Sequence, residues 1–192
     1  TMSEEQRRAF REGAARMGLP VDMLESYEPW FVSLQLAQLV ALAAGLDSAN
    51  GAEAVLTEAA RASGKPISAF ETAEEQMRII DGTPESEQIL GLLQVLEEPA
   101  RAVADVNGLL ASWASGDPET TGQLLNAETE AVPVTRRMLL TERNRRWAQY
   151  IEERLAQPGS MFIAVGAGHL AGADSVQEML RARGIPVERI VY

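Results

Sequence analysis

The chain has 192 residues, of which 46% are hydrophobic and 23% charged, enough apolar material for a single domain with a sizeable core. Its 28 acidic and 17 basic side chains give a net charge of −11, so the surface repels phosphate backbones and we expect no nucleic-acid partner. The absence of cysteine excludes disulfides, thiolate metal sites and cysteine nucleophiles.

The first third of the chain is predicted to be helical. Ser3 and Gln6 have the spacing of a capping box, which opens a helix that ends near residue 18. Proline in the first turn and glycine after the last predict a second helix over residues 29–45. A third helix is expected over residues 52–64.

The most apolar stretch, residues 31–46, is interrupted by Gln35 and Gln38. It is shorter than the ~20 residues that a spanning helix needs, so we expect no membrane span in this chain. No basic-then-apolar leader precedes Ser3 and Thr1 is not an initiator, so the natural start of the protein is expected to lie further upstream.

The middle of the chain combines one predicted strand with a long helical region. Residues 65–70 form a short apolar-leaning segment between two helices and are predicted to be a strand. From residue 72 to about 157 only helical patterns occur, broken at three turns that contain proline, at 82–84, 116–118 and 131–133. We therefore expect a single domain over residues 1–192 with an all-helical insertion over 72–157.

The last helix of this insertion, about residues 134–156, carries one stripe of mostly apolar side chains. The stripe comprises Leu140, Asn144, Trp147, Ile151 and Leu155. A buried amide must be hydrogen-bonded, so Asn144 either braces a neighbouring loop or orients a site residue. The adjacent Arg143 can bind an anion together with Arg145 and Arg146, although pairing of those two with Glu142 explains part of this cluster as solvated charges.

The C-terminal part is predicted to be strand, loop, helix and strand. Residues 161–165 are continuously apolar, as in a strand covered on both faces. A helix over about 174–184, with Asp174 as its capping residue, leads to a last strand over 187–192. The predicted fold class is therefore α/β, with an incomplete, mostly parallel sheet. Three strands are too few for so many helices, so further strands are expected before Thr1, and the open sheet edge favours pairing into a homo-oligomer.

His169 is the single histidine and follows Gly166 and Gly168 at the end of a predicted strand, where open α/β sheets bind ligands. The glycines would let a ligand approach closely, and the imidazole can serve as metal ligand or general base. The alternative is a capping or hydrogen-bonded structural histidine. Glu71 ends another predicted strand and can face the same cleft, although it also suits a surface position before a helix N-terminus.

Four motifs in chain order resemble those of the TraB/GumN family. They are Phe70-Glu71-Thr72 with Glu75-Gln76, Leu140-Thr141-Glu142-Arg143-Asn144 through Trp147, Val165-Gly166-Ala167-Gly168-His169-Leu170 with Gly172, and Leu180-Arg181-Ala182-Arg183-Gly184 through Val187. The resemblance spans essentially all 192 residues. It implies a Tiki/TraB-like α/β fold, related to erythromycin-esterase-like and ChaN-like proteins, with two Gly-x-x-His motifs.

Within this resemblance, Gly166 to His169 match the second Gly-x-x-His motif, Glu71 matches the acidic site residue, and Arg143 and Asn144 match a polar helix pair. The first motif has no counterpart, because the chain has no second histidine. The resemblance therefore implies that this chain lacks part of the family site and is inactive by itself.

The activity implied by the resemblance is that of a metal-dependent hydrolase, with a peptide or protein as substrate and a location in the cell envelope or periplasm. His169 and Glu71 would bind a divalent Mn, Co or Zn ion that activates water. Arg143 would stabilise oxyanion charge, with Asn144 orienting it. Two alternatives stay open: a non-catalytic module that binds or sequesters a peptide, and a scaffold whose site has decayed.

Overall fold

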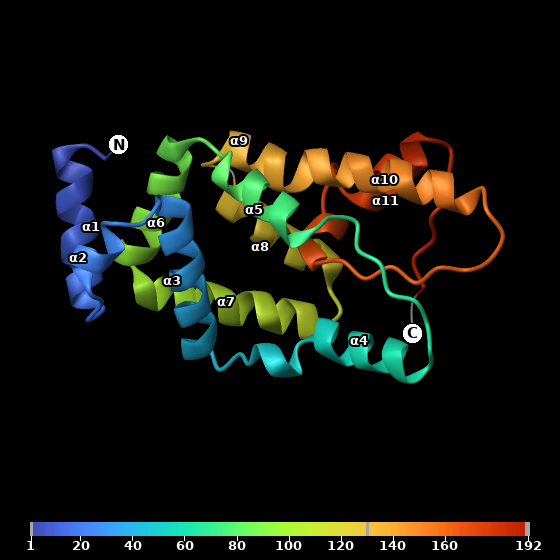
Figure 1. Ribbon diagram of the computed structural model, residues 1–192, viewed down its shortest axis with the longest axis horizontal. Coiled ribbons are helices and arrows are strands. Elements are labelled where there is room, and N and C mark those ends of the chain that lie inside the picture. Colours follow the sequence, from blue (N-terminus) through green and yellow to red (C-terminus); the bar gives the residue numbers. More distant parts are fainter. Residues whose placement is uncertain (1, 130, 191–192) are drawn as a thin grey trace. The chain divides into compact units, whose positions relative to one another are not determined.

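The computed structural model describes residues 2–129 and 131–190, which form two compact units, 1–110 and 111–192 (Figure 1). Helices account for all of the regular structure in these residues. Those that begin in unit 1 are α1 (Glu4–Arg16), α2 (Val21–Leu24), α3 (Pro29–Ala43), η1 (Ser48–Asn50), α4 (Ala52–Ala62), α5 (Ala73–Asp81), α6 (Glu85–Glu97) and α7 (Pro99–Ala114). Those of unit 2 are α8 (Pro118–Thr129), α9 (Pro133–Arg136), η2 (Arg137–Thr141), α10 (Glu142–Leu155), η3 (Ala167–Leu170) and α11 (Val176–Ala182).

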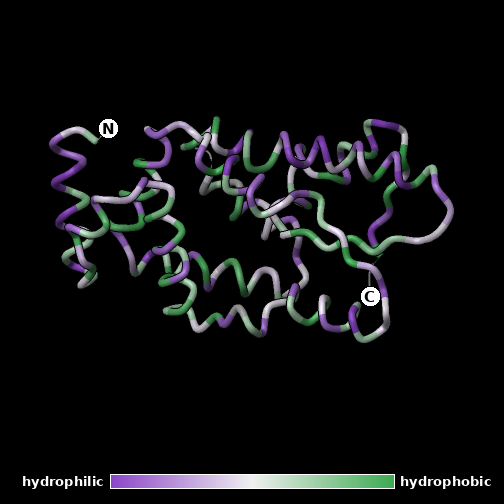
Figure 2. Tube along the Cα trace, in the orientation of Figure 1, coloured by the Kyte–Doolittle hydropathy of each residue, from purple (hydrophilic) through white to green (hydrophobic). Residues whose placement is uncertain are grey.

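The predicted α/β fold with a parallel sheet is wrong, because the described residues contain no strand. Residues 65–69, 161–165 and 185–190 are chain without regular structure, and residues 191 and 192 of the last predicted strand lie outside the described part. A helix satisfies its own backbone, whereas a strand takes its hydrogen bonds from a neighbour. Figure 2 shows the hydrophobic run over 161–165, yet Phe162 is 79% exposed, so apolar character alone did not make this segment a covered strand.

Unit 1 has its core where α6 packs against α1 and α3. Phe10, Leu36, Leu92 and Leu96 are fully buried there. The close approach of α1 and α6 depends on Gly13, because a Cβ at this position would lie 2.7 Å from the Cβ of Leu96. Unit 1 is therefore a helical core in its own right.

The predicted helix starts are largely confirmed. The Ser3 hydroxyl accepts from the Gln6 amide at 3.2 Å, while the Gln6 side chain accepts from the Ser3 amide at 2.9 Å. Thr72 forms a second capping box with Glu75 at the start of α5. The break between α6 and α7 was not predicted, although Pro99 marks it, since proline cannot continue the preceding helix.

In unit 2, α10 and α11 lie side by side, and α8 and α11 both contact the short turn η3 (Figure 1). The predicted stripe is confirmed at Asn144, Trp147 and Ile151, which are buried, and wrong at Leu155, which is 60% exposed. The predicted single helix over 134–156 is interrupted by the π-helical turn η2 just before α10. None of the helices in the described parts of the chain is long and apolar enough to cross a membrane.

Candidate functional site

His169 lies in the 3-10 turn η3 and is 9% exposed. Its backbone N–H donates to the Gly166 carbonyl at 2.9 Å, which closes the turn. Gly166 has φ −57° and ψ 142°, angles open to any residue, and a Cβ on Gly168 would make an ordinary 3.5 Å contact with Leu125. The turn itself therefore does not require these glycines, and their assignment as cofactor-binding residues stays a prediction.

Asn144 determines which nitrogen of His169 carries the proton. Its Nδ2 donates to the backbone carbonyl of Asp174 at 2.7 Å, an oxygen that can only accept. Its Oδ1 therefore faces Nδ1 of His169, 2.6 Å away, so Nδ1–H is the donor of that hydrogen bond. In the neutral imidazole with its proton on Nδ1, the lone pair lies on Nε2, the type of nitrogen that binds a metal ion or a proton.

The ring of His169 packs against Trp147, with ring centroids 4.3 Å apart. The Arg143 guanidinium lies over the Trp147 ring at 4.9 Å from its centroid, and Arg143 also donates to the Leu139 carbonyl at 3.0 Å. A cation over an indole face is attracted by the ring electrons. Arg143 is thus joined to His169 through Trp147, and its predicted role toward an oxyanion stays a prediction.

Asp174 was predicted to cap the last helix, but that position belongs to Ser175, whose hydroxyl accepts from the Glu178 amide. The Asp174 carboxylate instead accepts from Arg136 at 2.9 Å and from the Thr141 hydroxyl at 3.0 Å. The hydrogen-bonded network at His169 thus extends through Asn144 to the backbone carbonyl of Asp174, and the carboxylate of Asp174 continues it to Arg136 and Thr141.

Glu71 belongs to unit 1, where it is half-buried and directly precedes the capping residue Thr72 of α5. A carboxylate just before a helix N-terminus is favoured by the helix dipole, so this position of Glu71 is explained without a role in a metal site. Within the described chain, no group of three or more histidine, aspartate and glutamate side chains is arranged to hold a metal ion. A metal role for His169 and Glu71 therefore stays a prediction.

Gly122 is a site-forming residue that the sequence reasoning missed. It lies within α8, and a Cβ there would come within 2.4 Å of the Ala171 Cβ, directly after the His169 turn. A glycine inside a helix costs about 1 kcal/mol relative to alanine, which was a sign of a packing role. Thr141 and Asp174 had no comparable signal, because their contact depends on the π-helical turn.

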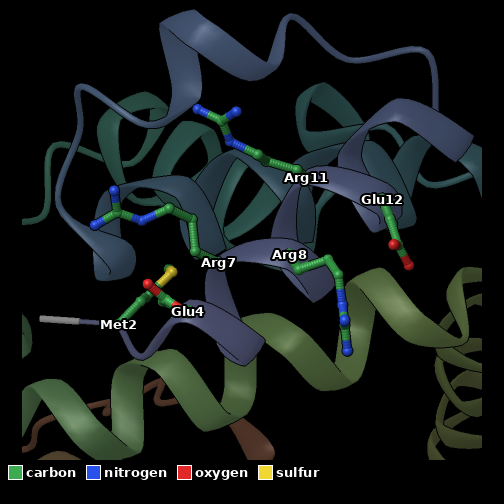
Figure 3. Close-up of a pocket in the computed structure, with 6 residues that line it drawn as sticks. All are labelled: Met2, Glu4, Arg7, Arg8, Arg11 and Glu12. Atoms are coloured by element: carbon green, nitrogen blue, oxygen red, sulfur yellow. The ribbon is translucent and has the colours of Figure 1, made fainter.

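A separate hollow of about 600 Å³ lies along α1 in unit 1. Its side chains do not converge: Figure 3 shows Arg11 leaving one side of the helix while Arg8 and Glu12 leave another. Arg11 forms a bidentate pair with Glu25, and this hydrogen bonding holds the pKa of the Glu25 carboxyl below its ordinary value. Because these side chains diverge and Arg11 is already paired with Glu25, the hollow lacks the convergent polar groups of a binding site.

The sequence matches the model of the TraB/PrgY/gumN family over residues 1–189, and the chain belongs to that family. It is 26% identical over 196 residues to an uncharacterised protein of Treponema pallidum (strain Nichols), covering 95% of this chain and 58% of the relative. It is also 26% identical over 180 residues to the uncharacterised protein YbaP of Escherichia coli (strain K12), covering 94% of this chain and 66% of YbaP. No solved structure matches the chain significantly. The chain thus spans about six-tenths to two-thirds of the length of these relatives.

Proposed function

We propose that this chain is the part of a metal-dependent hydrolase, of peptidase type, that contributes an imidazole ligand through Nε2 of His169. The observation that supports this is the hydrogen bond from His169 Nδ1–H to Asn144. Metal-binding histidines commonly donate their second ring N–H to a fixed acceptor, which selects the tautomer and orients the ring.

The fit of a metal to the described residues is partial. They supply one well-oriented imidazole nitrogen in a buried setting, and a bound ion would need further donors from the full-length protein. The prediction that Glu71 serves as an acidic ligand rests on the family resemblance alone. A bound divalent ion would polarise the scissile carbonyl and lower the pKa of its water.

The residues around His169 would prepare the site for such an ion. Asn144 holds the proton on Nδ1, and Trp147 fixes the ring plane by packing against it at 4.3 Å between centroids. Arg143, held over Trp147, brings a permanent positive charge to the same helix. We assign it the stabilisation of negative charge that develops on the substrate carbonyl oxygen.

The test compares the full-length protein with two variants at position 169. His169→Ala removes the whole ring, whereas His169→Asn keeps a side-chain N–H for Asn144 and removes the far edge of the ring, which includes Nε2. We expect both variants to lose Mn²⁺, Co²⁺ or Zn²⁺ uptake in calorimetric titrations and to lose peptide cleavage. Because the asparagine variant can retain the buried hydrogen bond although it loses the ring packing on Trp147, its thermal unfolding should lie closer to that of the parent than that of His169→Ala, which separates loss of a ligand from loss of the fold.

Unchanged metal uptake in His169→Asn would reject this proposal. Unchanged peptide binding in both variants, with no metal requirement, would instead support a non-catalytic peptide-binding module.

A further inference from the structure

Both the side chain and the backbone of Asp174 are hydrogen-bonded to one continuous helical segment, formed by α9, η2 and α10. Its carboxylate accepts from Arg136 and Thr141, and its carbonyl accepts from Asn144. The carboxylate side chain is 37% exposed, so the Arg136 ion pair alone contributes little to stability. The three contacts together fix where the Asp174 carbonyl points.

The π-helical turn η2 allows two side chains of this segment to reach the Asp174 carboxylate. Residues five apart lie about 140° from each other around an α-helix, which advances 100° per residue. In a π-helical turn the hydrogen bonds run between residues five apart, so such residues lie on the same face of the helix, much as residues four apart do in an α-helix. Arg136 directly precedes the turn and Thr141 is its last residue, five positions on, and both donate to the same carboxylate. Asn144 follows Thr141 by three, the spacing that places two side chains on one helix face.

We infer that Asp174 and Thr141 are positioning residues that select the Nδ1–H tautomer of His169. With the Asp174 carbonyl held in place, the Asn144 amide directs Nδ2 toward it and Oδ1 toward the imidazole. Once the carbonyl is released, the amide can turn over and present its NH₂ group to His169. Nδ1 would then accept, and the proton would move to Nε2.

This inference rests on the proposed function only in assigning metal binding to Nε2 of His169; the tautomer itself follows from the hydrogen bonds of Asn144. The tautomer can be read without any metal, because His169 is the single histidine of the chain and gives one set of imidazole signals. Failure of metal binding would therefore reject the proposed function and leave the tautomer assignment standing.

The experiment is ¹⁵N NMR of the imidazole nitrogens in the metal-free protein at alkaline pH, where the ring is neutral. For the parent we expect a protonated Nδ1 and an unprotonated Nε2. Thr141→Val removes the hydroxyl with little change in shape, and Asp174→Ala removes the carboxylate. Both should show a substantial Nε2–H population, while Thr141→Ser should retain the parent pattern. In metal titrations, the first two should bind about 10- to 100-fold more weakly, as for other residues that orient a ligand.

Several results would overturn the inference. One is an Nε2–H tautomer in the parent. Another is the parent pattern in both Thr141→Val and Asp174→Ala. A third is Thr141→Ser behaving like Thr141→Val, since the hydroxyl would then not be the group that matters. Circular dichroism of each variant shows that the comparison is between folded proteins, and Thr141→Val provides the readout if Asp174→Ala does not fold.

Discussion

Replacement of Gly122 by alanine should separate α8 from the turn that carries His169. The new Cβ would lie 2.4 Å from the Cβ of Ala171, whereas carbon atoms in contact prefer about 3.5 to 4.0 Å. The helix or the turn must therefore move by more than about 1 Å. Overpacking of this kind costs about 1 to 3 kcal/mol, partly offset by the gain of about 1 kcal/mol for alanine over glycine in a helix.

Gly108→Ala in α7 isolates the second of these two effects. No atom lies within 4 Å of a Cβ built on Gly108, so this variant should gain helix propensity without a clash, by up to about 1 kcal/mol. The difference between the two variants in free energy of unfolding should then be about 1 to 3 kcal/mol, in favour of Gly108→Ala. Urea denaturation followed by circular dichroism measures it.

The NMR signals of His169 give a second readout that is local to the site. We expect them to shift in Gly122→Ala and to stay unchanged in Gly108→Ala. Equal stability of the two variants, together with unchanged His169 signals in both, would refute the argument that Gly122 exists to let α8 approach the turn.

Two further variants test the buried network and a helix cap. Asn144→Ala removes the hydrogen bonds that Asn144 makes with the His169 ring and the Asp174 carbonyl. The free energy of unfolding, measured by urea denaturation, should fall by about 1 to 3 kcal/mol. A decrease below about 0.5 kcal/mol would contradict the network. Asp117 caps α8, and its hydrogen bonds, first that from the Thr120 hydroxyl, lower the pKa of its carboxyl below the ordinary 3.8. A carboxyl group with a lowered pKa stabilises the folded state above the unfolded-state pKa, and this contribution is lost as pH falls through the folded-state pKa. The parent should therefore unfold at a higher temperature than Asp117→Asn at neutral pH, and this difference in unfolding temperature should shrink below about pH 4. An advantage that is the same at pH 7 and pH 3 would show that the carboxylate charge is not involved.

Helix ends were predictable because their signals are local. The capping box at Ser3 and the glycine-proline turn at 116–118 act through residues three or four positions away, so the sequence contains the whole interaction. The burial of Asn144 was predictable for the same reason, since helical spacing alone places it on the stripe with Trp147.

Strands were not predictable in this way, because a strand depends on a partner that may lie anywhere in the chain. The run over 161–165 has the composition of a covered strand, but it has no strand beside it in the described residues. The resemblance correctly placed the chain in its family, and the same motifs led to the wrong expectation of a sheet within these residues.

Part of the candidate site could be predicted from the sequence, and the contacts of Asp174 could not. His169, Arg143 and Asn144 were singled out, and the structure brings all three together around Trp147. Asp174 was assigned to a helix cap, because the sequence gives no sign that a π-helical turn aligns Arg136 with Thr141. Such a turn changes the helical phase without a distinctive residue, so a pattern based on regular spacing cannot reveal it.

The π-helical turn also determines where this chain can change in length. Residues five apart in this turn lie at an angle close to that of residues four apart in an α-helix, so removing one residue from 137–141 would restore an ordinary α-helix and leave Asn144 on nearly the same face. A one-residue deletion should therefore be tolerated within 137–141, among natural relatives as well as in engineered versions, whereas an insertion or deletion at 142–143 would rotate Asn144 by about 100° relative to Thr141. The exposed coil at 157–160, by contrast, can accept an affinity tag or a fluorophore without disturbing the imidazole.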